Sequence, residues 1–257
     1  MNMEKGNISG WSGMSDEYQE KSFISLTDIH LAPLSLGDQE VGLIDNFLGK
    51  RFLELGCGAA QNSIVADRNG ACAVAVDGSS RQLYHALKLR VESNSNVELV
   101  KADLENLDWL KSESFDYVIS MFALEFVEDI ERFIAQCFRA LHADGTFILS
   151  TVHPLSAFDW DHEKSQLIVS DYFNPPLEIW KDSKSENNPP NFTLFRTIGE
   201  IFTTISNAGF VVEKLLEPVA EHKMDRAKIP YGGQYWEPFR DRLERIPFAI
   251  VIKARKP

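Results

Sequence analysis

Residues 52–62 read FLELGCGAAQN, and this stretch indicates how the central part of the chain folds. An apolar run typical of a buried strand leads into two glycines separated by one residue, and a segment of small residues follows. Here a strand is followed by a turn of glycines and small residues and then by a helix. Such a turn contains free backbone N–H groups and lies at the positive end of the helix dipole. The arrangement suits a nucleotide-like ligand lying across the loop, although a lone Gly-x-Gly also occurs in plain tight turns.

The segments around this stretch alternate between short β-branched or apolar runs and longer amphipathic patterns. Strands are predicted at residues 51–56, 71–77, 97–103, 115–121 and 145–152, and helices at 61–69, 79–92 and 127–142. This alternation is the signature of βαβ units and a parallel sheet. A further helix is predicted at 196–210. Because only a loop joins the last two predicted strands, 211–218 and 247–256, we expect them to be antiparallel.

The rest of the chain is expected to elaborate one main domain at residues 51–257. Residues 1–50 are interpreted as an N-terminal lid with helices at about 16–26 and 36–48. Two long segments, 154–194 and 219–246, are interpreted as insertions beside the ligand site, because irregular chain of this length is usually functional. The aromatic residues of the first insertion could line a pocket, pack against one another, or form the interface of a homodimer.

Composition narrows the function classes. The 257 residues contain 26 basic and 38 acidic side chains, a net charge of −12, so a nucleic-acid or anionic-membrane surface is not expected. Three scattered cysteines favour neither a disulfide framework nor a metal site. The sequence has no apolar run long enough for a membrane span and no segment like a signal peptide, so we expect a cytoplasmic protein.

Each of the first three predicted strands has an acidic residue within it or at its end. Asp77 ends the second strand about 20 residues after the glycine loop, where a carboxylate can accept hydrogen bonds from ribose hydroxyls. Asp103 ends the third strand, and Glu54 lies within the first. A dinucleotide site normally needs Gly or Ala where this chain has Gln61. An adenosyl ligand with a cationic amino-acid tail fits the carboxylates better.

The residues ELGCGAA at 54–60 resemble the first motif, E/D-x-G-x-G-x-G, of class I S-adenosylmethionine-dependent methyltransferases, with Ala60 in place of the third glycine. FDYVISMFALEFVED at 115–129 resembles the family's fourth strand and the segment after it, and RALHADGTFIL at 139–149 its approach to the fifth. The resemblance implies an α/β fold with a Rossmann-like seven-stranded sheet of order 3-2-1-4-5-7-6, the last strand being antiparallel. A narrower likeness is to bacterial small-molecule methyltransferases of specialised metabolism.

The resemblance also implies a cofactor, S-adenosylmethionine, with S-adenosylhomocysteine as its product. The residues expected to bind it are Glu54, Gly56, Cys57, Gly58, Gln61, Asp77, Gly78, Asp103, Leu104 and Met121. The expected reaction is methyl transfer to an oxygen or nitrogen of a small, partly aromatic molecule. A general base is needed only where that acceptor atom must lose a proton to react.

His153 and Glu125 are the candidate bases, because each follows a strand at the edge where the methyl group is expected. The candidate acceptor-binding residues are Tyr18, His30, Tyr172, Arg196, Tyr231 and Trp236. Each has a structural alternative: His153 could simply end a strand, and Arg196 could be an ordinary salt-bridge partner.

Two other functions remain open at this point. The chain could be a methyltransferase-like protein that uses the cofactor pocket for a non-methylating reaction, such as a cyclisation, or for regulatory binding. It could also be an NAD-dependent oxidoreductase, which Gln61 and the aligned Asp103 argue against.

Overall fold

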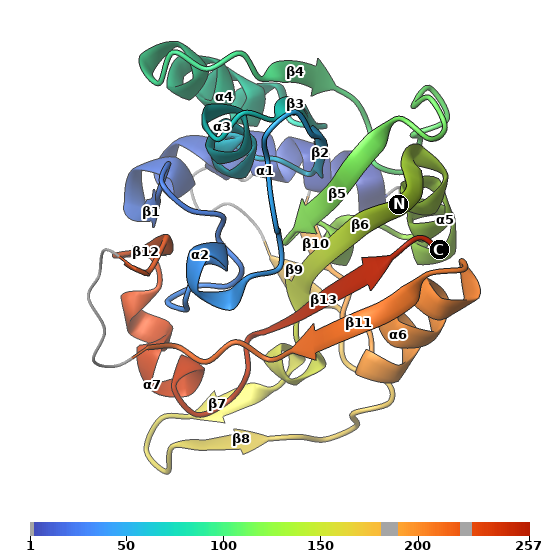
Figure 1. The fold of residues 1–257 in the computed structure, drawn as a ribbon. Coiled ribbons are helices and arrows are strands. Elements are labelled where there is room, and N and C mark those ends of the chain that lie inside the picture. The colour runs from blue at the N-terminus through green and yellow to red at the C-terminus, as the bar shows by residue number, and fades with distance from the viewer. Residues whose placement is uncertain (1–2, 181–189, 222–227) are drawn as a thin grey trace.

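A computed structural model describes residues 3–180, 190–221 and 228–257, and side chains from residue 7 onward, around a seven-stranded sheet (Figure 1). In spatial order the strands are β4 (Glu98–Lys101), β3 (Cys72–Asp77), β2 (Arg51–Leu55), β5 (Phe115–Met121), β6 (Leu141–Val152), β13 (Ala249–Arg255) and β11 (Val211–Leu216). The strands from β4 to β6 are parallel, and β13 runs antiparallel to both β6 and β11. The predicted fold class and strand order are therefore confirmed.

Helices cover both faces of the sheet. They are α3 (Gln61–Arg68), α4 (Ser80–Glu92), α5 (Ile130–Ala140) and α6 (Ile198–Asn207). Ile64 of α3 and Ala86 of α4 share one buried cluster with Phe52 of β2, whereas α5 and α6 belong to the cluster that contains Leu53 and Leu55. Because successive strand residues point to opposite faces, Glu54 lies on the α3 side.

The N-terminal region differs from the two predicted helices. The first helix, α1, begins far earlier and spans Met3–Lys21, and the chain then forms β1 (Ser22–Ile24), which pairs antiparallel with β12 (Tyr231–Gly233). The prediction was wrong here because the partner strand lies about 200 residues away in sequence. Helix α1 packs against α4 and β10.

The second predicted N-terminal helix is a single turn, α2 (Asp38–Val41). The Asp38 carboxylate accepts hydrogen bonds from the N–H groups of Leu43 and Ile44, at 2.7 and 3.1 Å. These bonds compete with the helical backbone bonds, and Gly42 takes a left-handed conformation at φ +68°, so the helix ends there.

The two predicted insertions contain short elements of their own. The first has η2 (Pro154–Ala157), the hairpin of β7 (Asp159–Asp161) and β8 (Gln166–Ile168), and the pair β9 (Glu178–Trp180) and β10 (Asn191–Thr193). The second holds β12, η4 (Glu237–Phe239) and α7 (Arg240–Leu243), and η1 (Leu124–Phe126) follows β5. Figure 1 shows the β7–β8 hairpin at the margin of the molecule, away from the sheet. In the parts of the chain that the structure describes, no helix combines the length and apolarity needed to cross a bilayer.

Candidate active site

The glycine loop leaves β2 through backbone conformations that other residues rarely adopt. Gly56 and Gly58 have φ values of +75° and +53°. A Cβ added to Gly56 would lie 2.2 Å from the Cβ of Ala123, so the loop and the segment after β5 approach closely only because Gly56 has no side chain. Ala60, at the N-terminus of α3, is also left-handed at φ +59°, a conformation that a glycine would adopt without strain.

Asp77, at the end of β3, holds this loop in place through hydrogen bonds to its backbone. Its Oδ2 accepts the N–H of Gly58 and its Oδ1 accepts the N–H of Ser79, each at 2.8 Å. Burial raises the pKa of Asp77 to about 6. A carboxylate has about four lone-pair positions, so two remain for a ligand that donates hydrogen bonds.

Glu54 is a carboxyl group within the sheet, only 2% exposed. Its Oε1 accepts from Nδ2 of Asn62 at 3.0 Å, and its Oε2 accepts from the backbone N–H and the hydroxyl of Ser63 at 2.9 and 2.5 Å. These bonds hold the start of α3 against β2. Burial nevertheless raises the pKa of Glu54 to about 7, so a cationic ligand at this point would favour its ionised form.

A cavity of about 540 Å³ extends from this loop into a chamber with aromatic walls. Nine of the ten predicted cofactor residues line it: Glu54, Gly56, Cys57, Gly58, Asp77, Gly78, Asp103, Leu104 and Met121. Gln61, the tenth, is not among the lining residues. Its side-chain amide donates instead to Oε1 of Gln19 in α1, at 2.9 Å, and so it ties α1 to the loop.

Four of the six predicted acceptor residues, Tyr18, His30, Tyr231 and Trp236, line the same cavity. The hydroxyl groups of Tyr18 and Tyr231 are hydrogen-bonded to each other, which joins α1 to β12 across the chamber. Further rings on the wall are Trp11, Phe122, Phe126, Trp180, Phe195, Tyr235, Phe239 and Phe248. The chamber is therefore suited to a flat apolar molecule.

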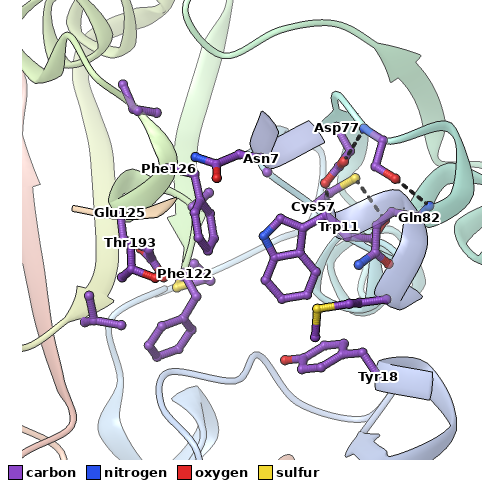
Figure 2. A pocket seen from close by; sticks show the side chains of 18 of the residues that line it. Asn7, Trp11, Tyr18, Cys57, Asp77, Gln82, Phe122, Glu125, Phe126 and Thr193 are labelled. Atoms are coloured by element: carbon purple, nitrogen blue, oxygen red, sulfur yellow. Dashed lines mark hydrogen bonds between the residues drawn. The ribbon is translucent and has the colours of Figure 1, made fainter. Parts of the chain in front are cut away.

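Glu125 projects into this chamber from η1 (Figure 2). The side chain is 3% exposed, and its Oε2 accepts a hydrogen bond from the hydroxyl of Thr151 at 3.0 Å. Burial raises the pKa of Glu125 to about 7. A carboxyl group with such a pKa is partly ionised at neutral pH and can accept a proton there.

Besides Gln61, three predicted site residues, His153, Tyr172 and Arg196, lie outside the cavity wall. His153 is not on the cavity wall: its Nε2 lies 2.9 Å from Oε1 of Glu217, and its Nδ1 accepts the N–H of Leu155 at 3.0 Å. Both ring nitrogens are thus engaged, and the ring faces the segment after β11. Tyr172 is also absent from the wall; its ring contacts Phe173, with ring centroids 5.6 Å apart.

Arg196 is buried beneath the site instead of within it. Its guanidinium donates to the backbone carbonyls of Leu124, Val127 and Glu128. These carbonyls belong to η1 and the chain just after it, so Arg196 holds the segment that carries Glu125. This supporting position replaces the predicted contact with an acceptor carboxylate.

Sequence reasoning placed the N-terminal segment over the site as a lid but named no site residue of α1 before Tyr18. Asn7, Ile8, Trp11 and Met14 all line the cavity. Figure 2 shows Trp11 between the side chains of Asp77 and Cys57 and those around Glu125, and its ring centroid lies 5.6 Å from that of Phe126. The helical spacing of Ile8, Trp11 and Tyr18 was a usable signal, but the glycines at 6, 10 and 13 weaken the helix pattern.

The chain resembles a known protein family and several known proteins in sequence. Residues 53–149 match the family model of a methyltransferase domain. The chain is 26% identical over 242 residues to an uncharacterized protein of Haemophilus influenzae, covering 91% of this chain and 89% of that protein. It is 29% identical over 154 residues to the ubiquinone biosynthesis O-methyltransferase of Pseudomonas fluorescens, a match that spans 59% of this chain and 65% of that enzyme.

Solved structures share the fold. The S-adenosylmethionine dependent methyltransferase of Mesorhizobium loti superposes with a TM-score of 0.66 at 24% identity, covering 84% of this chain and 94% of that one. Among the described side chains, no group of three or more His, Cys, Asp or Glu residues is placed to hold a metal ion.

Proposed function

We propose that this chain, a member of the class I S-adenosylmethionine-dependent methyltransferase superfamily, methylates an oxygen or nitrogen atom of a small, partly aromatic molecule. The observation that carries the proposal is the single cavity that joins the glycine loop to an aromatic chamber containing Glu125. S-adenosylmethionine, when bound, supplies a methyl group on a positively charged sulfur. The protein then has to align the acceptor atom with that methyl group and keep water away.

The residues of the glycine-loop end fit an adenosyl ligand. Asp77 keeps two lone-pair positions for the hydroxyl groups of a ribose, and the bare backbone at Gly56 and Gly58 lets a ligand approach closely. Glu54 accepts three hydrogen bonds, which leaves one position on Oε1 for an amine. Asp103 and Leu104 are assigned to the adenine.

The chamber supports an aromatic acceptor. Its rings come from α1, from the exit of β5 and from both insertions, so that they surround the space on several sides. Flat rings gain from edge-to-face and offset contacts with such walls, beyond the burial of apolar area. The glycine-loop end and the chamber together have a volume of about 540 Å³, which is within the range of small-molecule sites.

Glu125 is assigned as the group that receives the acceptor's proton. A hydroxyl acceptor must lose its proton as it reacts, and the pKa of Glu125, about 7, allows its carboxylate to take that proton near neutrality. The Thr151 hydroxyl, which donates to Oε2, orients the carboxyl group within the chamber. An amine acceptor can react through its lone pair and release its proton to Glu125 afterwards.

Binding and transfer can be tested separately. Titration calorimetry with S-adenosylhomocysteine, and with NADH as the control ligand, measures whether the cavity takes the adenosyl ligand alone. A panel of phenols and aromatic amines with isotope-labelled S-adenosylmethionine then tests methyl transfer. Glu125→Gln is expected to keep the affinity for S-adenosylhomocysteine and to lose most of the transfer to a phenol; Glu131→Gln, on the exposed face of α5, is the matched control.

The results of these binding and transfer experiments distinguish the alternative functions. Binding of S-adenosylhomocysteine without labelled product from any acceptor favours a non-methylating or regulatory use of the pocket. If protein freed of copurified ligand binds NADH and not S-adenosylhomocysteine, the chain is an oxidoreductase and the proposal is wrong.

A further inference from the structure

Arg242 is the one Arg or Lys among the described residues that line the cavity. It belongs to α7, in the second insertion, and its side chain is half-buried. Taking a cation partly out of water costs free energy, and this burial lowers the pKa of Arg242. A cation held at such a cost on the wall of a binding cavity indicates a structural contact, a ligand contact, or both.

The protein uses only part of the Arg242 guanidinium. Its Nη2 donates to the carbonyl of Leu155 in η2, at 2.9 Å, which fixes the position of the group. Nε and Nη1 make no hydrogen bond to any residue that the structure describes. Neither of these atoms is among the buried polar atoms that lack a partner, so both are accessible. Because a guanidinium presents its N–H donors in a planar fork that matches a carboxylate, Arg242 keeps donors for a ligand.

The acidic residues nearest in effect to Arg242 do not neutralise it by direct contact. The charges of Glu178 and Asp159 act on the guanidinium, but neither carboxylate forms an ion pair with it. Both side chains belong to exposed residues, and water weakens the interactions of exposed charges. An anion in contact with Nε and Nη1 would therefore gain more from Arg242 than these two carboxylates do.

A second cavity, of about 390 Å³, adjoins the chamber at Arg242. The residues that line both cavities are Ser156, Glu178, Phe195, Phe239 and Arg242. None of them belongs to the glycine loop, and no residue assigned to the adenosyl ligand lines the second cavity. Arg242 therefore lies on the acceptor side of the site, where there is room for a substituent of the acceptor.

Glu125 and Arg242 lie at separate places on the wall. The cation whose charge acts on Glu125 is Arg196, buried beneath the site. Arg242 interacts instead with Glu178 and Asp159, and it lines the second cavity, which Glu125 does not reach. A single acceptor in contact with both Glu125 and Arg242 would thus carry its reacting atom at one end and an anionic group at the other.

We infer that Arg242 binds a carboxylate of the acceptor through Nε and Nη1, while the reacting hydroxyl or amine of the same molecule faces Glu125. This inference rests on the proposed function and narrows its substrate class to aromatic acids. Nη2 stays on the carbonyl of Leu155, so the guanidinium does not have to move when the acid binds. Arg242 then makes the contact with an acceptor carboxylate that was predicted for Arg196.

The test compares charged acceptors with uncharged ones. Hydroxybenzoate, hydroxyphenylacetate and hydroxyphenylpropanoate place a carboxylate at increasing distances from the phenol, and the methyl ester of each removes the charge. Initial rates with isotope-labelled S-adenosylmethionine give kcat/KM for every acid and ester.

Three variants separate the role of Arg242 from a general effect on structure. Arg242→Gln removes the charge, and Arg242→Lys keeps the charge without the planar fork. Arg245→Gln is the matched control, because Arg245 pairs with Asp241 at 3.0 Å and lines neither cavity. Thermal unfolding and the affinity for S-adenosylhomocysteine show that each variant is folded and that its cofactor end is intact.

We expect the wild type to prefer at least one acid over its ester by about tenfold or more in kcat/KM, because the acid gains a hydrogen bond between charged groups. Arg242→Gln should lower kcat/KM for that acid about tenfold or more and leave the ester and the affinity for S-adenosylhomocysteine unchanged. Arg242→Lys should lie between the two, and Arg245→Gln should behave like the wild type.

Two results would overturn the inference and leave the proposed function standing. One is a wild type that methylates every ester at least as well as the matching acid. The other is an Arg242→Gln variant that loses the same factor with acid and ester. A wild type that binds S-adenosylhomocysteine but labels no acid, ester, phenol or aromatic amine would contradict the proposed function itself.

Discussion

Asp77→Ala tests the proposed ligand site at the residue with the most defined geometry. The substitution removes the acceptor for the N–H groups of Gly58 and Ser79, both 2.8 Å from the carboxylate, and the acceptor assigned to the ribose hydroxyls. Two hydrogen bonds to a charged group contribute about 3 kcal/mol together at the lower end of their range, so the Kd for S-adenosylhomocysteine should rise about a hundredfold.

The effect of Asp77→Ala on folding should be smaller than its effect on binding. Two backbone donors lose their partner, but the cost of keeping a buried carboxylate, seen in its pKa of about 6, disappears as well. We expect the free energy of unfolding to fall by about 1–2 kcal/mol. Chemical denaturation measures this change, and titration calorimetry measures the affinity.

Asp129→Ala is the matched control. Asp129 caps α5 by accepting the N–H of Arg132 at 2.9 Å, and it does not line the cavity. Its loss should cost about 1 kcal/mol of stability and leave the affinity unchanged. An Asp77→Ala protein that is folded and binds S-adenosylhomocysteine like the wild type would refute the assignment of Asp77 to the ribose.

Three further outcomes follow from the described contacts. With a phenol acceptor, kcat should rise with pH and show an inflection at about pH 7, where Glu125 ionises. Glu125→Gln should lower kcat about a hundredfold and remove this inflection from the pH–rate profile. Stability of the ligand-free protein, measured by denaturation, should decrease from pH 5 to pH 8. Glu54, Asp77 and Glu125 bind more protons when folded than unfolded, and together they outweigh His30, which binds fewer; a rise would contradict the raised pKa values of the three carboxyl groups. Gly56→Ala should lower the free energy of unfolding by over about 2 kcal/mol, because the added Cβ would lie 2.2 Å from the Cβ of Ala123. Gly49 is also left-handed but has open space around it, so Gly49→Ala should cost about 1 kcal/mol. Similar losses in the two variants, measured by denaturation, would show that the clash at Gly56 relaxes.

The central sheet was predictable because its signals are local. Each strand from β2 to β6 is a short apolar run bounded by turn residues, and right-handed crossovers leave few ways to order parallel strands. The positions of Asp77 and Asp103 followed from the same logic, since the carboxyl ends of parallel strands lie at one edge of a sheet. The reversed β13 followed from the absence of a crossover helix before it.

The orientation of His153 was beyond this reasoning. It immediately follows β6, as a site residue should, and its N–H donates to the carbonyl of Phe248 at 2.7 Å, which continues the pairing of β6 with β13. Its ring then meets Glu217, which follows β11. A side chain's direction at a strand end depends on the neighbouring strand, and no local pattern contains that information.

The sequence by itself determined the α/β sheet, the glycine loop and the carboxylates at its edge, because these depend on apolar periodicity, turn residues and strand polarity. Only the tertiary structure decided how the acceptor chamber is closed. The pairing of β1 with β12 and the contact between the hydroxyls of Tyr18 and Tyr231 join segments about 200 residues apart. Such contacts are set by the shape and edges of the completed sheet, and they place α1, with Trp11, across the site.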